Sequence, residues 1–168
     1  MLPDLVSQFQ PDSVVAMAFA TEERLCYTLL MTIRVVLDTN VVFEGLTKQG
    51  GAAGLLIDLW RAGQMEVVVS NTLAYEYDDV LARKLSETRW QLIQPVLGTL
   101  LAHTTFVIIY YSWRPASPDP GDDLVIDCAM NGGAIVVTSN VRDFQSARVS
   151  LGLRVMSPVE LIIALAKP

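Results

Sequence analysis

A short apolar run that ends in a carboxylate reads Ile33-Arg34-Val35-Val36-Leu37-Asp38-Thr39-Asn40. Its β-branched residues predict a buried strand over 33–37, which leaves Asp38 at the carboxyl end of that strand. In open parallel α/β sheets, ligands bind outside the carboxyl ends of the strands. The run therefore predicts an α/β fold and an acidic site at one edge of its sheet.

The rest of the chain alternates between strand and helix patterns. Further strands are expected at 66–69, 105–109, 134–137 and 153–156, and helices at 40–47, 51–62, 72–84, 87–102, 122–131, 141–147 and 158–166. Residues 112–121, which are rich in proline, are expected to form a loop. Such alternation is typical of a mostly parallel central sheet, here of five strands, with helices on both faces.

The length and composition predict one domain with a sizeable core, because the chain has 168 residues and is 52% hydrophobic. Residues 1–30 precede the first α/β unit, so they are expected to form an N-terminal extension to a domain over 31–168. Acidic rather than basic residues precede the apolar stretch of this extension, which argues against a secretory signal. The extension is either an added helix or the product of a start codon assigned upstream of Met31.

Charge and residue counts limit the partners. A net charge of −6 argues against a broad positively charged surface that would bind nucleic acid. No apolar stretch reaches the roughly 18 residues of a membrane span. Cys26 and Cys128 are too few for a disulfide framework or a zinc site, which predicts a reducing, cytoplasmic setting. The apolar content predicts a surface buried against a second copy of the chain or a partner protein.

Each candidate site acid has a structural alternative. Asp38 could cap the next helix, although Thr39 or Asn40 could do so equally well. Glu76 lies on the flank of the apolar face of its expected helix, where a surface pair with Arg83 is the alternative. Both acids are nevertheless placed at the strand-end side of the sheet, so we expect them to share a site.

Two further clusters follow downstream. Asp119 followed by Pro120 fits a helix N-cap, after which Asp122 and Asp123 are either site acids or ordinary first-turn acids. A similar start, Ser157-Pro158-Val159-Glu160, lies near no other candidate and shows that the pattern can be purely structural. After the strand expected at 134–137 come Thr138-Ser139-Asn140 and then Asp143, where Ser139 or Asn140 could cap a helix.

Other chemistries find little support. His103 is the only histidine and lies at a helix-to-strand connection, so a Ser-His-Asp or Cys-His mechanism is not indicated. The sequence contains neither a Walker A motif nor a dinucleotide fingerprint. A haloacid-dehalogenase-like phosphatase also has an aspartate after its first strand, but it needs a second aspartate two residues on, where this chain has Asn40.

Four blocks between Ile33 and Pro158 together resemble the PIN domain, and in particular the VapC-like ribonucleases that are toxins of toxin–antitoxin pairs. The first block, Val35 to Val41, resembles the family's opening strand with its first metal-site aspartate, Asp38. The other three are Leu59 to Leu81 with its second acid on Glu76, Pro118 to Ala134 with the catalytic aspartate on Asp122, and Val137 to Phe144. Asn140 stands where many members of the family have aspartate.

The resemblance implies a three-layer α/β/α fold and a divalent-metal-dependent ribonuclease that cuts single-stranded or looped RNA and is restrained by an antitoxin. It implies Asp38, Glu76, Asp122 and Asp143 as catalytic residues, which together with Asp123 and Asn140 would hold Mg²⁺ or Mn²⁺. Supporting residues would be Thr39, Asn40, Thr138 and Ser139, and the candidates for phosphate contacts are Arg114, Arg142 and Arg148.

The chemistry agrees with this assignment. Cutting a phosphodiester requires an activated water and relief of charge in the transition state, both of which divalent ions provide. Magnesium keeps several waters and binds through few carboxylates, so sparse acids suffice. The alternative is a PIN-like module that has lost activity and binds RNA or protein, which Asn140 and the acidic net charge would suit.

Overall fold

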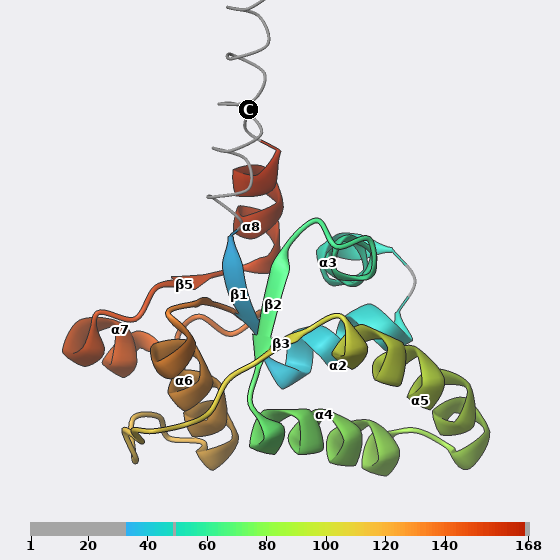
Figure 1. The fold of residues 1–168 in the computed structure, drawn as a ribbon, viewed down its shortest axis with the longest axis horizontal. Helices are drawn as coiled ribbons and strands as arrows, with labels where there is room; N and C mark the ends of the chain where they lie inside the picture. The colour runs from blue at the N-terminus through green and yellow to red at the C-terminus, as the bar shows by residue number, and fades with distance from the viewer. Residues whose placement is uncertain (1–32, 49, 167–168) are drawn as a thin grey trace, which may run out of the picture. The chain divides into compact units, whose positions relative to one another are not determined.

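The computed structural model describes residues 33–48 and 50–166 (Figure 1). The extension expected over residues 1–30 lies outside the described residues. In chain order the elements are β1 (Arg34–Leu37), α2 (Thr39–Thr47), α3 (Gly51–Arg61), β2 (Glu66–Val69), α4 (Asn71–Lys84), α5 (Glu87–Ala102), β3 (Thr105–Phe106), α6 (Pro120–Gly132), β4 (Ile135–Val137), α7 (Gln145–Leu151), β5 (Val155–Met156) and α8 (Pro158–Leu165).

The strands form one five-stranded sheet in the order β3-β2-β1-β4-β5, and every pair of neighbours is parallel. The central strand is β1, in which Val35 pairs with Val67 of β2 on one side and Ile135 of β4 on the other. Figure 1 shows α6 on one face of the sheet and α2 with α3 on the other. The predicted α/β/α layering with a central parallel sheet is confirmed.

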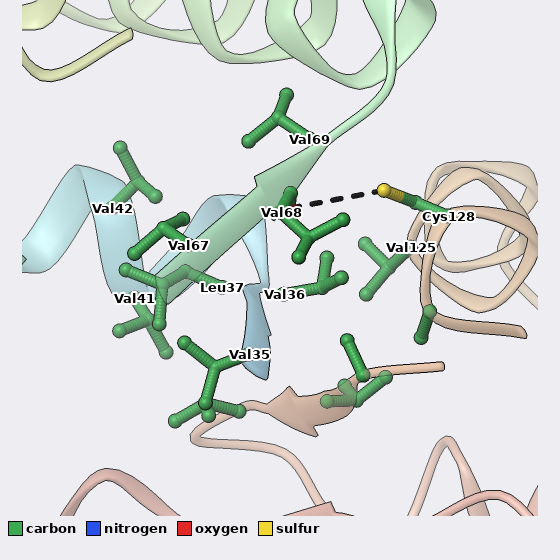
Figure 2. Close-up of a cluster of buried hydrophobic side chains, with 14 of the residues drawn as sticks. Val35, Val36, Leu37, Val41, Val42, Val67, Val68, Val69, Val125 and Cys128 are labelled. Carbon is green, nitrogen blue, oxygen red and sulfur yellow. Dashed lines mark hydrogen bonds between the residues drawn. The ribbon is translucent and has the colours of Figure 1, made fainter. Parts of the chain in front are cut away.

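The core forms because the central strands are apolar on both faces, as expected for parallel strands covered by helices. Val35–Leu37 of β1 are fully buried, and so are Val67–Val69 of β2. Figure 2 shows these valines packed with Val125 and Cys128 of α6. Fully burying one such side chain contributes roughly 1.5–3 kcal/mol. The strand that precedes Asp38 is therefore anchored in the buried core.

The predicted boundaries differ from the observed ones where the chain leaves the regular ladder. The strand expected over 105–109 ends at Phe106, because Asn131 of α6 binds the backbone N–H groups of Tyr110 and Tyr111 and draws the chain away from the sheet. The helix expected over 141–147 begins only at Gln145, since residues 141–144 form turns. The strand expected over 153–156 is reduced to Val155–Met156.

Several helices begin earlier than predicted. The helix expected from residue 122 starts at Pro120, and the one expected from residue 40 starts at Thr39. In both cases the helix begins at the residue directly after its N-cap, which is Asp119 for α6 and Asp38 for α2. Across residues 33–48 and 50–166, no helix is long and apolar enough to cross a membrane.

Gly45 provides the first testable prediction, because α2 packs closely on α3 at this position. A Cβ atom on Gly45 would lie 2.5 Å from Cγ1 of Ile57 and 2.7 Å from the carbonyl oxygen of Ala53. We expect Gly45→Ala to lower the free energy of unfolding by about 1–3 kcal/mol, because the backbone of α3 would have to move. Chemical denaturation followed by circular dichroism measures this change.

The matched control is Gly98→Ala in α5, where an added Cβ would have no atom within 4 Å. We expect Gly98→Ala to raise the stability by about 0.5–1 kcal/mol, because alanine is the better helix former. Equal effects of the two substitutions would contradict the close packing of α2 on α3.

Candidate active site

Asp38 is buried at the junction of β1 and β4. Its backbone N–H donates to the Val137 carbonyl at 2.9 Å, and its side chain is only 5% exposed. It occupies the N-cap position of α2 but makes no capping hydrogen bond there. Instead, Oδ2 accepts a hydrogen bond from the Thr138 hydroxyl at 2.7 Å. Capping therefore does not explain this carboxylate.

Burial is the main cause that raises the pKa of Asp38 above its ordinary value. The hydrogen bond from Thr138 and the nearby backbone amides of Asn40 and Thr39 act in the opposite direction, while the negative charge of Asp119 raises the pKa further. A buried carboxylate of this kind is ionised at a cost, which a bound cation would offset.

Glu76 reaches the same edge of the sheet from α4. The next residue, Tyr77, is fully buried and its hydroxyl donates to the Leu37 carbonyl, which ties α4 to the end of β1. Oε1 of Glu76 lies 3.8 Å from where a Cβ on Gly121 would be, so this carboxylate faces the first turn of α6. The alternative pairing with Arg83 is wrong, because Arg83 binds Asp79 of its own helix at 2.8 Å.

Asp122 shows most directly that the acids converge. Its carboxylate accepts a hydrogen bond from the Ser117 hydroxyl at 2.9 Å. Burial, followed by the negative charges of Asp38, Asp119 and Asp143, raises the pKa of Asp122 to about 6, although the Ser117 hydrogen bond lowers it. Residues far apart in the sequence thus place Asp122 in the field of three other carboxylates.

The capping prediction for Asp119 is confirmed. Asp119 is the N-cap of α6 with Pro120 at the first helical position, and its side chain accepts a hydrogen bond from the Gly121 N–H at 2.9 Å. The comparison segment behaves as predicted too, because Ser157 and Glu160 form a complete capping box at the start of α8. Capping is therefore the role of Asp119 in this cluster, and the Asp122 carboxylate takes no part in it.

The fourth cluster is connected to Asp38 by hydrogen bonds. The side-chain amide of Asn140 donates to Asp143, and the backbone N–H of Asn140 donates to the Thr138 hydroxyl at 2.9 Å. Thr138 in turn donates to Asp38, so one chain of contacts runs from the turn after β4 to the end of β1. Ser139 faces elsewhere, with its hydroxyl 3.4 Å from Glu44.

Asp123 and two of the three candidate arginines make contacts away from this cluster. Oδ1 of Asp123 accepts hydrogen bonds from the backbone N–H groups of Ala116 and Ser117, so it supports the loop before α6. Arg114 donates to Asp127, and Arg148 donates to Gln145 on its own helix. Arg142 is exposed and lies next to Asp143 in the chain. A metal-ligand role for Asp123 stays a prediction.

Two polar residues of α6, Asp127 and Asn131, were not singled out from the sequence. Asp127 is buried and accepts hydrogen bonds from the Ser112 hydroxyl, the Trp113 N–H and the Arg114 guanidinium at 2.8–2.9 Å. Asn131 binds the backbone of Tyr110 and Tyr111. With Asp123 they form a polar row at four-residue spacing on a helix whose remaining side chains, apart from Asp122, are apolar. This spacing is the signal that could have revealed them.

The site suits a divalent cation bound through few protein ligands. Nowhere in the described residues do three His, Cys, Asp or Glu side chains lie close enough together to hold one ion between them. Magnesium does not need such a cage, because it keeps several waters and uses one or two carboxylates plus substrate phosphates. The side-chain oxygen of Asn40, two residues after Asp38, is buried and has no hydrogen-bond donor within the described part of the chain. A bound water could satisfy this oxygen.

Comparison with protein families identifies the domain. A family model of the PIN domain matches residues 34–142, which is more than half of the chain. The chain belongs to the PIN domain family. PIN domains are in general nucleases that use divalent metal ions. No curated protein matches this sequence.

Solved structures agree with the fold. VapBC2 from Rickettsia felis, bound to a DNA fragment from its promoter, contains a chain that matches with a TM-score of 0.55 at 14% identity, over 74% of this chain and 98% of that one. FitAcB from Neisseria gonorrhoeae matches with a TM-score of 0.54 at 19% identity, again over 74% and 98%. FitAB bound to the IR36 DNA fragment matches with a TM-score of 0.51 at 17% identity, over 74% and 94%.

The pKa of Asp122 yields a prediction for the metal-free PIN domain. Because the pKa rises from 3.8 to about 6 on folding, the folded state binds this proton more tightly than the unfolded state does. The contribution of Asp122 to the free energy of unfolding is therefore fully present below about pH 4 and is lost as the pH rises through 6. In EDTA at pH 7, we expect Asp122→Asn to raise Tm by about 2–4 °C, which corresponds to roughly 1 kcal/mol once solvent screening is allowed for.

Thermal melts of the metal-free protein at pH 7 and at pH 4 measure this effect, and the gain is expected to vanish at pH 4. Asp78→Asn is the control, because Asp78 is an exposed carboxylate on α4 outside the cluster. A lower Tm for Asp122→Asn than for the wild type at pH 7 would show that burial and the neighbouring charges do not destabilise the ionised Asp122 carboxylate.

The second prediction for this site concerns Asp127. Asp127→Ala removes a buried carboxylate and leaves Arg114, Ser112 and the Trp113 N–H without their partner, so we expect a loss of about 2–4 kcal/mol in the free energy of unfolding. The control is Asp79→Ala, which breaks the exposed pair with Arg83 and is expected to cost less than about 1 kcal/mol. Urea denaturation of both variants measures the difference, and similar losses would refute the supporting role of Asp127.

Proposed function

We propose that this PIN domain is a divalent-metal-dependent endoribonuclease that hydrolyses phosphodiester bonds in single-stranded or looped RNA. The observation that carries the proposal is the convergence of acids around Asp122, whose pKa is raised first by burial and then by the charges of Asp38, Asp119 and Asp143. Glu76 reaches the same first turn of α6. An uncompensated group of carboxylates at a strand end is costly unless cations bind there, and family membership supports a nuclease.

In this proposal Asp38, Glu76 and Asp122 hold Mg²⁺ or Mn²⁺, while Asp143 and Asn140 complete the site or orient water. When bound, the ion would supply an activated water and neutralise charge on the transferring phosphate. Thr138 fixes the rotamer of Asp38 through its hydroxyl, in the way that outer residues commonly orient metal ligands. Arg142, exposed next to Asp143, is the arginine best placed to contact a substrate phosphate.

The biological role that we propose is that of the toxin in a toxin–antitoxin pair. Support comes from the resemblance to VapC-like toxins and from the similarity in fold to VapBC2 from Rickettsia felis and to FitAB, both of which were solved with a DNA fragment. We propose an antitoxin as the protein partner of this chain on the same grounds. The homodimer and the cytoplasmic setting stay predictions from composition.

The alternative is an inactive PIN-like module that binds RNA or protein. It is favoured by Asn140, whose side-chain amide donates to Asp143 and thus occupies one carboxylate oxygen that a metal would use. The two functions differ in one measurable property, because only the nuclease must bind a divalent ion in order to act.

The test is cleavage of an end-labelled, mixed-sequence single-stranded RNA by the purified full chain in Mg²⁺ or Mn²⁺. We expect Asp38→Asn and Glu76→Gln each to reduce the cleavage rate by at least about 100-fold, because loss of a direct ligand should exceed the 10–100-fold cost of disturbing an outer residue. EDTA should abolish cleavage. Asp78→Asn, on the same helix as Glu76 but exposed, should leave the rate within about twofold of wild type.

Cleavage that persists equally in both variants would indicate a contaminating nuclease. If the wild type is inert and calorimetry detects no Mn²⁺ binding, the nuclease proposal fails and the binding module takes its place.

A further inference from the structure

The segment between β3 and α6 carries exposed aromatic side chains that the acid cluster does not use. Tyr110 is 75% exposed and Tyr111 is 72% exposed. The ring of Trp113, which is partly buried, has its centroid 6.3 Å from that of Tyr111 at an interplanar angle of 48°. We refer to Tyr110, Tyr111 and Trp113 as the aromatic strip. Adjacent exposed aromatic side chains of this kind often mark an interaction site.

The backbone of the aromatic strip is held firmly against α6, along which the segment passes in Figure 1. Asn131 accepts hydrogen bonds from the N–H groups of Tyr110 and Tyr111 at 3.0 and 3.2 Å, and donates to the Tyr111 carbonyl at 2.8 Å. Asp127 accepts from the Trp113 N–H at 2.9 Å. Since both anchoring residues lie on one rigid helix, the two tyrosine side chains are presented outward in a preorganised arrangement.

The charge around the aromatic strip suits a polyanion. The chain carries a net charge of −6, yet it has no Asp or Glu between Thr88 and Pro118. Arg114 follows the strip directly and its side chain is 49% exposed. Only its Nε is engaged, with Asp127, so within the described structure the two terminal nitrogens of the guanidinium have no protein partner. The carboxylates of Asp127 and Asp123, which bind this segment from α6, are buried, so the segment exposes the Arg114 cation and no acidic side chain of its own.

The aromatic strip is also connected to the acid cluster. The same segment continues to Ser117, whose hydroxyl donates to Asp122 at 2.9 Å. The six Cα-to-Cα steps from Tyr111 to Ser117 can span at most about 20 Å even when fully extended. A single strand of a few nucleotides can therefore contact the tyrosines and Asp122 at the same time.

We propose that the aromatic strip stacks the unpaired bases of single-stranded RNA and thereby positions the strand at the acid cluster. This inference rests on the proposed ribonuclease function and specifies how its substrate is held. Aromatic rings beside a cationic side chain are a common platform for unpaired bases, because every base has a face that can stack. A base-paired strand keeps its bases stacked on one another, so the strip would select single-stranded over double-stranded substrate.

A protein partner is the competing occupant, because Phe106 and Ile108 are also exposed and lie just before the strip. Phe106 lies on the edge strand β3 and Ile108 follows it in the chain, and both side chains are apolar. The tyrosines differ from them in lying closer in the chain to Arg114 and to Ser117, whose hydroxyl binds Asp122. The observations therefore favour RNA at the strip, and protein binding becomes an outcome of the test.

The experiment measures equilibrium binding by fluorescence anisotropy, with the full chain in Ca²⁺ and two labelled probes. One is an oligouridylate of about 12 nucleotides, and the other is an abasic strand of the same length and charge. We expect Tyr110→Ala and Tyr111→Ala each to weaken oligouridylate binding about 10-fold, since stacking on one ring contributes about 1–3 kcal/mol and 1.4 kcal/mol corresponds to a factor of ten. Binding of the abasic strand should not change.

The matched control is Tyr75→Ala, which truncates a tyrosine on α4 that is 77% exposed and outside the strip. It should leave the affinity for both probes unchanged. Hydrolysis of bis(p-nitrophenyl) phosphate in Mn²⁺ provides a second readout, because this small diester is too short to reach the strip. All three variants should hydrolyse it at the wild-type rate.

The possible failures have different signatures. Unchanged oligouridylate binding in both strip variants would overturn the proposal, and so would an equal loss of binding to the abasic strand, because the tyrosines would then not act by stacking. Unchanged RNA binding together with a lower sedimentation coefficient would assign the strip to a protein interface. If tyrosine-dependent binding is found but neither RNA nor the small diester is cleaved, the ribonuclease proposal fails while the stacking surface stands.

Discussion

Several carboxylates lie close together at the end of a buried strand, and the rest of the domain must offset their electrostatic repulsion. Asp38 is nearly inaccessible to water, and Asp119 and Asp143 add their charges to its own at Asp122. Folding places these groups together against their mutual repulsion, so other contacts must stabilise the arrangement. The fully buried Val35–Leu37 of β1 and Val67–Val69 of β2 contribute to this stabilisation, because they anchor the strand end from which Asp38 projects.

Specific hydrogen bonds then fix the orientation of each acid. Thr138 holds Asp38, Ser117 holds Asp122, and the Tyr77 hydroxyl joins α4 to the end of β1, so that Glu76 stays close to the first turn of α6. The Thr138 and Ser117 hydroxyls each bind one oxygen of their carboxylate and leave the other oxygen for a ligand. In the proposed function, this arrangement would hold the carboxylates ready for a hard cation.

Helix α6 connects the chemistry with the surface around it. Its first turn carries Asp122, while the polar row Asp123, Asp127 and Asn131 binds the backbone of residues 110–117. One rigid element therefore sets the position of the acid cluster and of the exposed aromatic side chains at once. In the proposed mechanism this common support would keep a bound strand in register with the site that cuts it.

The order of strands and helices, the parallel sheet and the place of Asp38 follow from the sequence, because apolar runs, caps and strand-end acids are local patterns. Asp119 was predicted as a cap for the same reason. The sequence could not separate Asp122 from Asp123, which are adjacent in the chain but about 100° apart around the helix. Packing of α6 turns Asp122 toward the acids and Asp123 toward the loop. Arg114, predicted to contact phosphate, binds Asp127 thirteen residues away. Such contacts depend on which helix face meets which segment, and only the assembled tertiary structure settles that.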